Sequence, residues 1–120
     1  MNKPTNFTRM VILPDTCIEL NRLLINEISI IQDTPRVLYQ VPFELSKTPN
    51  RVWKEALMEN WSNVSKLRTG DLKTILWVYH NRVLIKNVSI ELFQEDLEKI
   101  LSRAIKMTNT QMGRKQKLAI

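Results

Sequence analysis

Residues able to carry out nucleophilic or metal chemistry are scarce in this sequence. His80 is its only histidine and Cys17 its only cysteine. A nucleophile–histidine pair would have to use His80. His80 lies at a predicted hairpin tip, however, where little protein surrounds it to exclude water. We therefore interpret His80 as a turn residue and Cys17 as a small buried residue.

Cofactor sites are also hard to build from this composition. The only glycines are Gly70 and Gly113, which excludes a glycine-rich phosphate loop. One histidine and one cysteine cannot supply the ligands of a typical zinc site. A carboxylate-bound magnesium site stays open, but helix electrostatics already explain the acidic cluster, which consists of Glu91, Glu95, Asp96 and Glu98. We expect no cofactor, no resident metal and no catalytic residue.

The most suggestive group of residues lies in a predicted hairpin between Leu72 and Lys86. If His80 and Asn81 form a two-residue loop, Tyr79 faces Arg82 and Trp77 faces Leu84, and opposed residues share a face. One face is then aliphatic, with Leu76, Val78, Val83 and Ile85. The other is mixed, with Ile75, Trp77, Tyr79, Arg82, Leu84 and Lys86.

The mixed face suggests nucleic-acid binding. Aromatic rings that stack on bases, with cations nearby for phosphates, are typical of proteins that bind single strands. The candidate nucleic-acid or anion site consists of Lys66, Arg68, Lys73, Trp77, Tyr79, Arg82 and Lys86. The simpler interpretation, which we favour, is that the long C-terminal helix covers Trp77 and Tyr79 while the cations reach past them to solvent. A second basic surface, comprising Lys99, Arg103, Lys106 and the C-terminal tail, is most simply a solvated helix face.

The first part of the chain, residues 9–45, is predicted to be mainly β-strand. Residues 9–13 form a short apolar strand, and Asn21-Arg22 is a possible turn between residues 17–20 and 23–31. A helix over 17–31 is the alternative, but dense β-branching favours strands there. Residues 37–43 alternate with the period of a strand. Pro42 cannot donate to a ladder, so this strand should lie at an edge or be bulged there.

Two amphipathic helices are predicted. Thr48 can cap the first and Pro49 suits its first position, and a stripe of Trp53, Leu57, Trp61 and Val64 indicates a helix of about 14 residues whose tryptophans belong to the core. The second runs from a Ser89 cap to about Met112, with Gly113 placed to end it. Its apolar stripe consists of Ile90, Phe93, Leu97, Ile100, Ala104 and Met107.

These elements predict the fold class. We expect an α+β fold in which an antiparallel β-sheet has two α-helices packed mainly on one side, because the long second helix can lie across a sheet. The 120 residues suit a single domain. We expect a frayed basic tail at residues 113–120.

The charge and the composition limit the kinds of partner that the protein is expected to bind. The net charge of +6 comes from an excess of lysine and arginine in residues 47–89 and 100–120. Such a field suits nucleic acid, an anionic surface or an acidic protein, although it also simply favours solubility. No apolar run approaches the roughly 20 residues that cross a bilayer, and no signal peptide is evident. With a single cysteine, these features predict a cytoplasmic protein with no membrane partner.

One segment carries a resemblance. The stretch Pro42-Phe43-Glu44-Leu45-Ser46-Lys47-Thr48-Pro49, followed by Trp53 and Trp61, resembles a segment of small uncharacterised prokaryotic proteins. In those proteins a hairpin-like stretch and a C-terminal helix follow it. The resemblance covers the last two-thirds of the chain. It implies a free-standing small domain and no particular activity.

The sequence thus favours a non-enzymatic binding protein, with nucleic acid as the first partner to test. The alternative is a homo-oligomeric or protein-interaction module with no nucleic-acid role. In that case the apolar strand edges and the isoleucine-rich segment 23–31 would be buried against another chain.

Overall fold

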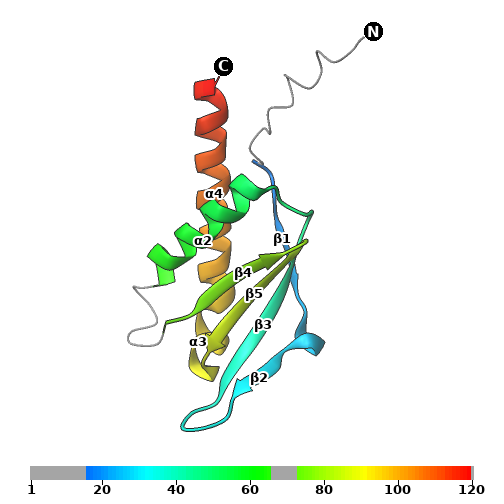
Figure 1. Ribbon diagram of the computed structural model, residues 1–120, viewed down its shortest axis with the longest axis vertical. Coiled ribbons are helices and arrows are strands. Elements are labelled where there is room, and N and C mark those ends of the chain that lie inside the picture. The colour runs from blue at the N-terminus through cyan, green and yellow to red at the C-terminus, as the bar shows by residue number, and fades with distance from the viewer. Residues whose placement is uncertain (1–15, 66–72, 120) are drawn as a thin grey trace.

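A five-stranded antiparallel sheet forms the centre of the fold. The computed structural model describes residues 16–65 and 73–119, so the strand predicted over residues 9–13 lies outside the described part. The sheet has the order β1–β3–β5–β4, and β2 pairs with β3 on the same side as β1 (Figure 1). The strands are β1 (Leu20–Leu23), β2 (Ser29–Gln32), β3 (Leu38–Leu45), β4 (Ile75–Tyr79) and β5 (Arg82–Val88).

Strand rather than helix forms at the start of the described chain. β1 and β2 pair with the two halves of β3 and are separated by a short 3-10 helix, η1 (Ile25–Glu27). The preference for strands over 17–31 is therefore confirmed. The turn predicted at Asn21-Arg22 is wrong, because both residues lie inside β1. The interruption comes three residues later, at η1.

Pro42 explains why the sheet edge formed by β1 and β2 is interrupted where it is. It sits in β3, which pairs on both sides, so the edge alternative is wrong. The other alternative, an irregularity at this residue, agrees with the interruption of the pairing between β1 and β2 opposite Pro42. The Pro42 carbonyl accepts a hydrogen bond from Leu24 N at 3.0 Å. A regular antiparallel pair would return an N–H to the Leu24 carbonyl, but proline has none. Glu27 N donates to that carbonyl instead, at 2.9 Å, and so closes η1.

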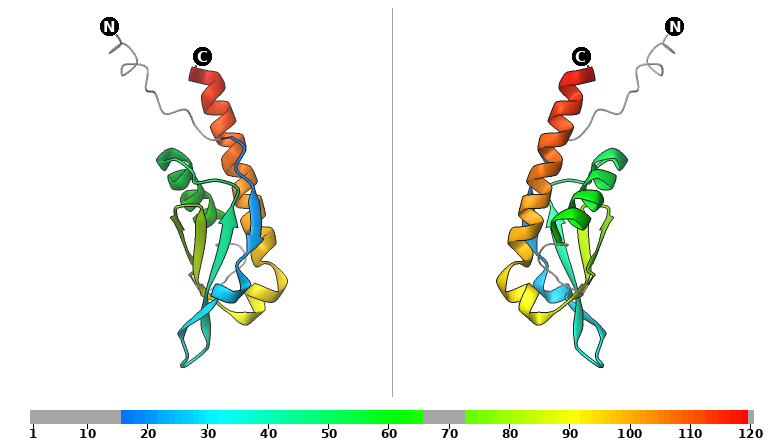
Figure 2. Two further views of the ribbon diagram at one scale, coloured as in Figure 1. Left: turned by 90° about the vertical axis from the view of Figure 1, so that its right-hand side faces the viewer. Right: turned by 90° about the vertical axis from the view of Figure 1, so that its left-hand side faces the viewer.

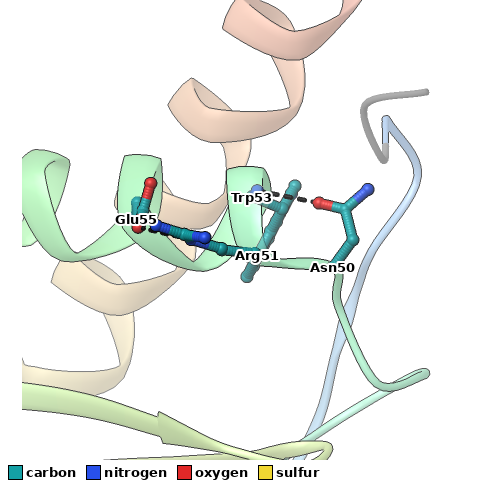
Figure 3. Close-up of polar contacts among 4 residues, drawn as sticks. All are labelled: Asn50, Arg51, Trp53 and Glu55. Atoms are coloured by element: carbon teal, nitrogen blue, oxygen red, sulfur yellow. Dashed lines mark hydrogen bonds and ion pairs between the residues drawn. The ribbon is translucent and has the colours of Figure 1, made fainter. Parts of the chain in front are cut away.

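The first long helix, α2 (Arg51–Ser65), begins with an asparagine cap. Asn50 Oδ1 accepts a hydrogen bond from Trp53 N at 3.0 Å (Figure 3). The predicted cap at Thr48 and first position at Pro49 are therefore wrong by two residues. Within the first turn, Arg51 Nε lies 3.1 Å from Glu55 Oε2 on the exposed side of the helix (Figure 3).

The predicted C-terminal helix is two helices. Ser89 caps the first, α3 (Ile90–Glu95), as predicted, because its Oγ accepts from Leu92 N at 3.2 Å. The backbone leaves helical geometry at Asp96, where φ is −132°. The second helix, α4, then runs from Leu97 to Ala119. Gly113 does not end it, and the backbone of the tail predicted to be frayed is helical as far as Ala119.

The buried face of the C-terminal helices differs in part from the predicted stripe. Leu97, Ile100 and Ala104 are buried as predicted, whereas Ile90 and Met107 are exposed. Ile90 belongs to α3, before the break, and the buried face of α4 extends from the predicted stripe toward Leu101 and Thr108, which leaves Met107 at its margin. The further residues that α4 buries are Leu101, Ile105, Thr108 and Met112.

Both long helices lie mainly on one side of the sheet, which confirms the predicted α+β class. α4 runs behind the sheet in Figure 1, and α2 packs across α4. Figure 2 shows α4 on one side of the strands with α3 folded under its start. Trp53, Leu57, Trp61 and Val64 of α2 are buried in the core between these layers, as predicted. No helix in the described ranges is long and apolar enough to cross a membrane.

Candidate nucleic-acid interface

The hairpin of β4 and β5 has the predicted register. Tyr79 pairs with Arg82, Trp77 with Leu84 and Ile75 with Lys86. His80 occupies the turn with a φ of 55°, a conformation that histidine and asparagine tolerate better than most residues. The two faces of the hairpin are therefore composed as the sequence predicts.

The aliphatic face points into the core and the mixed face points outward. Leu76, Val78, Val83 and Ile85 are buried. By contrast, Ile75 is 47%, Trp77 54% and Tyr79 59% exposed. The favoured interpretation, in which the long helix covers these rings, is wrong. The helices pack on the aliphatic face because covering the mixed one would also desolvate Arg82 and Lys86.

We call the exposed side the outer hairpin face; it consists of Ile75, Trp77, Tyr79, Arg82, Leu84 and Lys86. Of the predicted cations, Lys73, Arg82 and Lys86 are exposed. Lys66 and Arg68 lie outside the described residues. The structure thus brings five of the seven candidate residues to one region, around β4 and β5.

The tip of the outer hairpin face carries acidic residues that the sequence did not reveal. Arg82 Nη1 forms an ion pair with Glu27 Oε1 of η1. Glu44 of β3 lies opposite Arg82 in the register and pairs with Arg22, with 3.1 Å between Arg22 Nε and Glu44 Oε1. Glu27 and Arg82 are 55 positions apart in the chain, so no local spacing could have indicated their contact.

The opposite end of the face carries two lysines, Lys73 and Lys86. Lys86 lies on β5 opposite Ile75, and Lys73 precedes β4. Asn87, with a φ of 64°, forms a bulge in the pairing with β3 and donates through Nδ2 to the Lys73 carbonyl at 3.1 Å. Neither lysine forms an ion pair with any residue in the described ranges. The face therefore runs from a charge-balanced tip to a cationic base.

The second predicted basic surface lies on another side of the molecule. Lys99, Arg103 and Lys106 are exposed on α4, whose buried residues face the sheet. A hollow of about 330 Å³ there is lined by Arg103, Lys106, Met107, Thr110, Gln111 and Arg114. The structure does not join this surface to the outer hairpin face.

Two other hollows lie near α3. An apolar hollow of about 170 Å³ lies between Ile28, Tyr39, Val41, Ile90 and Phe93. A larger one of about 620 Å³ lies at the junction of α3 and α4. Neither contains His80 or Cys17.

The two residues with catalytic potential lie apart from these hollows. Cys17 is exposed, so the prediction of a buried thiol is wrong. His80 is exposed at the hairpin tip, and its ring contacts that of Tyr79 edge to face with centroids 4.2 Å apart. Among the described residues, no group of three or more histidine, cysteine, aspartate or glutamate side chains is arranged to hold a metal ion.

Comparison with known proteins finds no relative of this chain. No family model, curated protein or solved structure matches this chain. The resemblance of residues 42–61 to a segment of small prokaryotic proteins stays a prediction. The chemistry that the outer hairpin face itself offers is stacking on aromatic rings, with cations beside them.

Proposed function

We propose that this protein is a non-enzymatic binding protein that takes nucleic acid on its outer hairpin face. The observation that carries the proposal is the exposure of Trp77 (54%) and Tyr79 (59%) on a sheet face with cations beside them. We place this role in the cytoplasm, because a chain with a single cysteine suits a reducing compartment.

Single strands are the form of nucleic acid that this chemistry favours. An indole or phenol ring stacks on the face of a base, and that face is accessible only where the base is unpaired. Stacking on an aromatic side chain contributes about 1–3 kcal/mol per base. The overall charge of +6 also attracts a polyanion.

The first test measures binding of a fluorescent single-stranded oligonucleotide by anisotropy at low salt. Trp77→Ala should weaken binding by about 5- to 150-fold, the equivalent of losing one stacked base. Because Trp77 lies outside the core, the variant should remain folded, and a urea unfolding curve checks that the loss of affinity is not a loss of structure. Failure of the wild-type protein to bind at low salt would overturn the proposal.

A pair of charge variants locates the site. Lys86→Gln removes a cation from the outer hairpin face and should lower affinity and flatten the salt dependence. Lys99→Gln removes the same charge from α4, on a different surface, and should leave affinity nearly unchanged. Equal effects of the two variants would indicate attraction to net charge alone and would contradict a site on the hairpin.

A protein-interaction module is the second candidate. The observation that favours it is the exposure of Ile25 (65%), Ile30 (60%) and Ile31 (44%) at the edge formed by η1 and β2. Apolar groups gathered at a sheet edge are typical of a protein contact. Light scattering distinguishes the two roles, since a protein complex would persist in high salt and after nuclease treatment.

A further inference from the structure

We propose that nucleic acid lies along β4 with its phosphates at Lys73 and Lys86, and that Glu27 withholds Arg82 from it. This inference rests on the proposed nucleic-acid function and adds a path, a footprint and a residue that limits affinity. Three features of the outer hairpin face support it.

The first feature is the row of apolar side chains on a single strand. Ile75, Trp77 and Tyr79 alternate with buried residues and share the outward side of β4. Alternate residues of a strand are spaced about 6.7 Å apart, so the row spans about 13 Å. Successive bases of one extended strand can therefore occupy neighbouring side chains of this row. The row accommodates two to three nucleotides along the direction of β4.

The second feature is the neutralised cation at the hairpin tip. The Arg82 guanidinium is bound by the Glu27 carboxylate, and the two side chains are 46% and 45% exposed. Glu44, opposite Arg82 in the register, is already paired with Arg22. A phosphate that approaches Arg82 must therefore displace Glu27 and meets a second carboxylate beside it. The tip repels a phosphodiester about as much as it attracts one.

The third feature is the pair of lysines, Lys73 and Lys86, at the other end of the row. Lys86 pairs with Ile75 across the hairpin, and the Lys73 main chain is tied to β5 by Asn87. No carboxylate in the described ranges forms an ion pair with either lysine. The phosphates accordingly lie near these two ammonium groups. Two phosphate contacts to a single strand imply a shallow salt dependence, with a slope of log K against log salt of about −1.4.

Glu27→Gln tests the withheld cation directly. The substitution keeps the size of the side chain but frees Arg82, which should add one phosphate contact. Affinity for single-stranded oligothymidylate should rise, and the salt slope should steepen by about 0.7. The ion pair is exposed, so its loss should cost the fold little.

Glu55→Gln is the matched control. It frees Arg51 from an ion pair of 3.1 Å on the exposed side of α2 (Figure 3), which adds the same net charge at another place. It should leave the affinity and the salt slope close to those of the wild type. If Glu27→Gln has no larger effect than Glu55→Gln, the assignment of Glu27 is wrong.

The footprint is tested with oligothymidylates of increasing length. The gain in affinity per added nucleotide should fall sharply after about three nucleotides, since the row of side chains is about 13 Å long. A continued steep gain would overturn the path along β4. If the wild-type protein binds but its affinity does not depend on Glu27 or on oligonucleotide length as expected, only this inference is contradicted. If the wild-type protein does not bind at all, the proposed function is contradicted as well.

Discussion

At the scale of single residues, Asn109 connects three parts of the chain. Its Oδ1 accepts from Trp53 Nε1 at 2.9 Å and from Ile18 N at 3.4 Å, while its Nδ2 donates to the Ile18 carbonyl at 2.8 Å. Trp53 is fully buried, so its indole N–H has no access to water. One side chain on α4 thereby ties α2 and the segment before β1 to the same helix.

Asn109→Ala should therefore be costly. It leaves the buried Trp53 N–H without a partner, and such a loss costs about 1–3 kcal/mol. The free energy of unfolding, measured with urea, should fall by that amount. Thr110→Ala, at an exposed neighbouring position on α4, should change it far less.

A double substitution isolates the Trp53 contribution. In a Trp53→Phe background the indole N–H is already absent, so Asn109→Ala should cost clearly less than in the wild type. An equal cost in both backgrounds would show that the hydrogen bond to Trp53 is not what Asn109 contributes.

At the scale of the elements, Pro42 shapes the edge of the sheet beside the candidate site. Proline in a strand that pairs on both sides would ordinarily be excluded. Here the side of Pro42 that lacks an N–H faces the point where the chain leaves β1 and enters η1. That same 3-10 helix carries Glu27, which binds Arg82. The proline is thus connected, through η1, to the charge at the hairpin tip.

Pro42→Val should destabilise the fold. The new N–H points toward η1, where Leu24 has left extended geometry, with a ψ of 74°, and its carbonyl closes η1 by accepting from Glu27 N. An unpaired buried donor costs about 1–3 kcal/mol, and the free energy of unfolding should fall accordingly. Gln40→Val places the same side chain two positions earlier in β3 and serves as the control. Unchanged or greater stability of Pro42→Val would mean that η1 does not depend on the proline.

At the scale of the whole molecule, the packing of both long helices on one side of the sheet leaves the other side of the hairpin open. Trp53 and Trp61 are enclosed between the layers, with their N–H groups bonded to Asn109 and Thr74. Trp77, on the opposite side, is half exposed. The three tryptophans therefore report on the two sides of the sheet separately.

Quenching of tryptophan fluorescence by iodide should reveal this division. A fraction of the emission should be readily quenched, and Trp77→Phe should remove that fraction. The remaining emission, from Trp53 and Trp61, should resist quenching until the protein unfolds. Strong protection of all three tryptophans in the wild type would contradict an open outer hairpin face.

Local patterns in the sequence determined much of this fold. The alternation of residues 75–86 around a two-residue turn predicts the hairpin register, because side chains on a strand point to opposite faces with a fixed period. The stripe of α2 and the cap at Ser89 follow from helical spacing and from hydrogen bonds within one turn. Each of these depends on residues that are close together in the chain.

Only the tertiary structure decided which hairpin face is open and what its charges contact. The covered side depends on where the helices pack, and the break at Asp96 that divides the C-terminal helix into α3 and α4 is not visible in the apolar pattern. The pair of Glu27 and Arg82 joins segments that are distant in sequence, and Pro42 is tolerated because a neighbouring strand ends beside it. Long-range packing is the physical reason in each case. Local periodicity shows which faces an element has, but only contacts between distant segments decide which of those faces is buried.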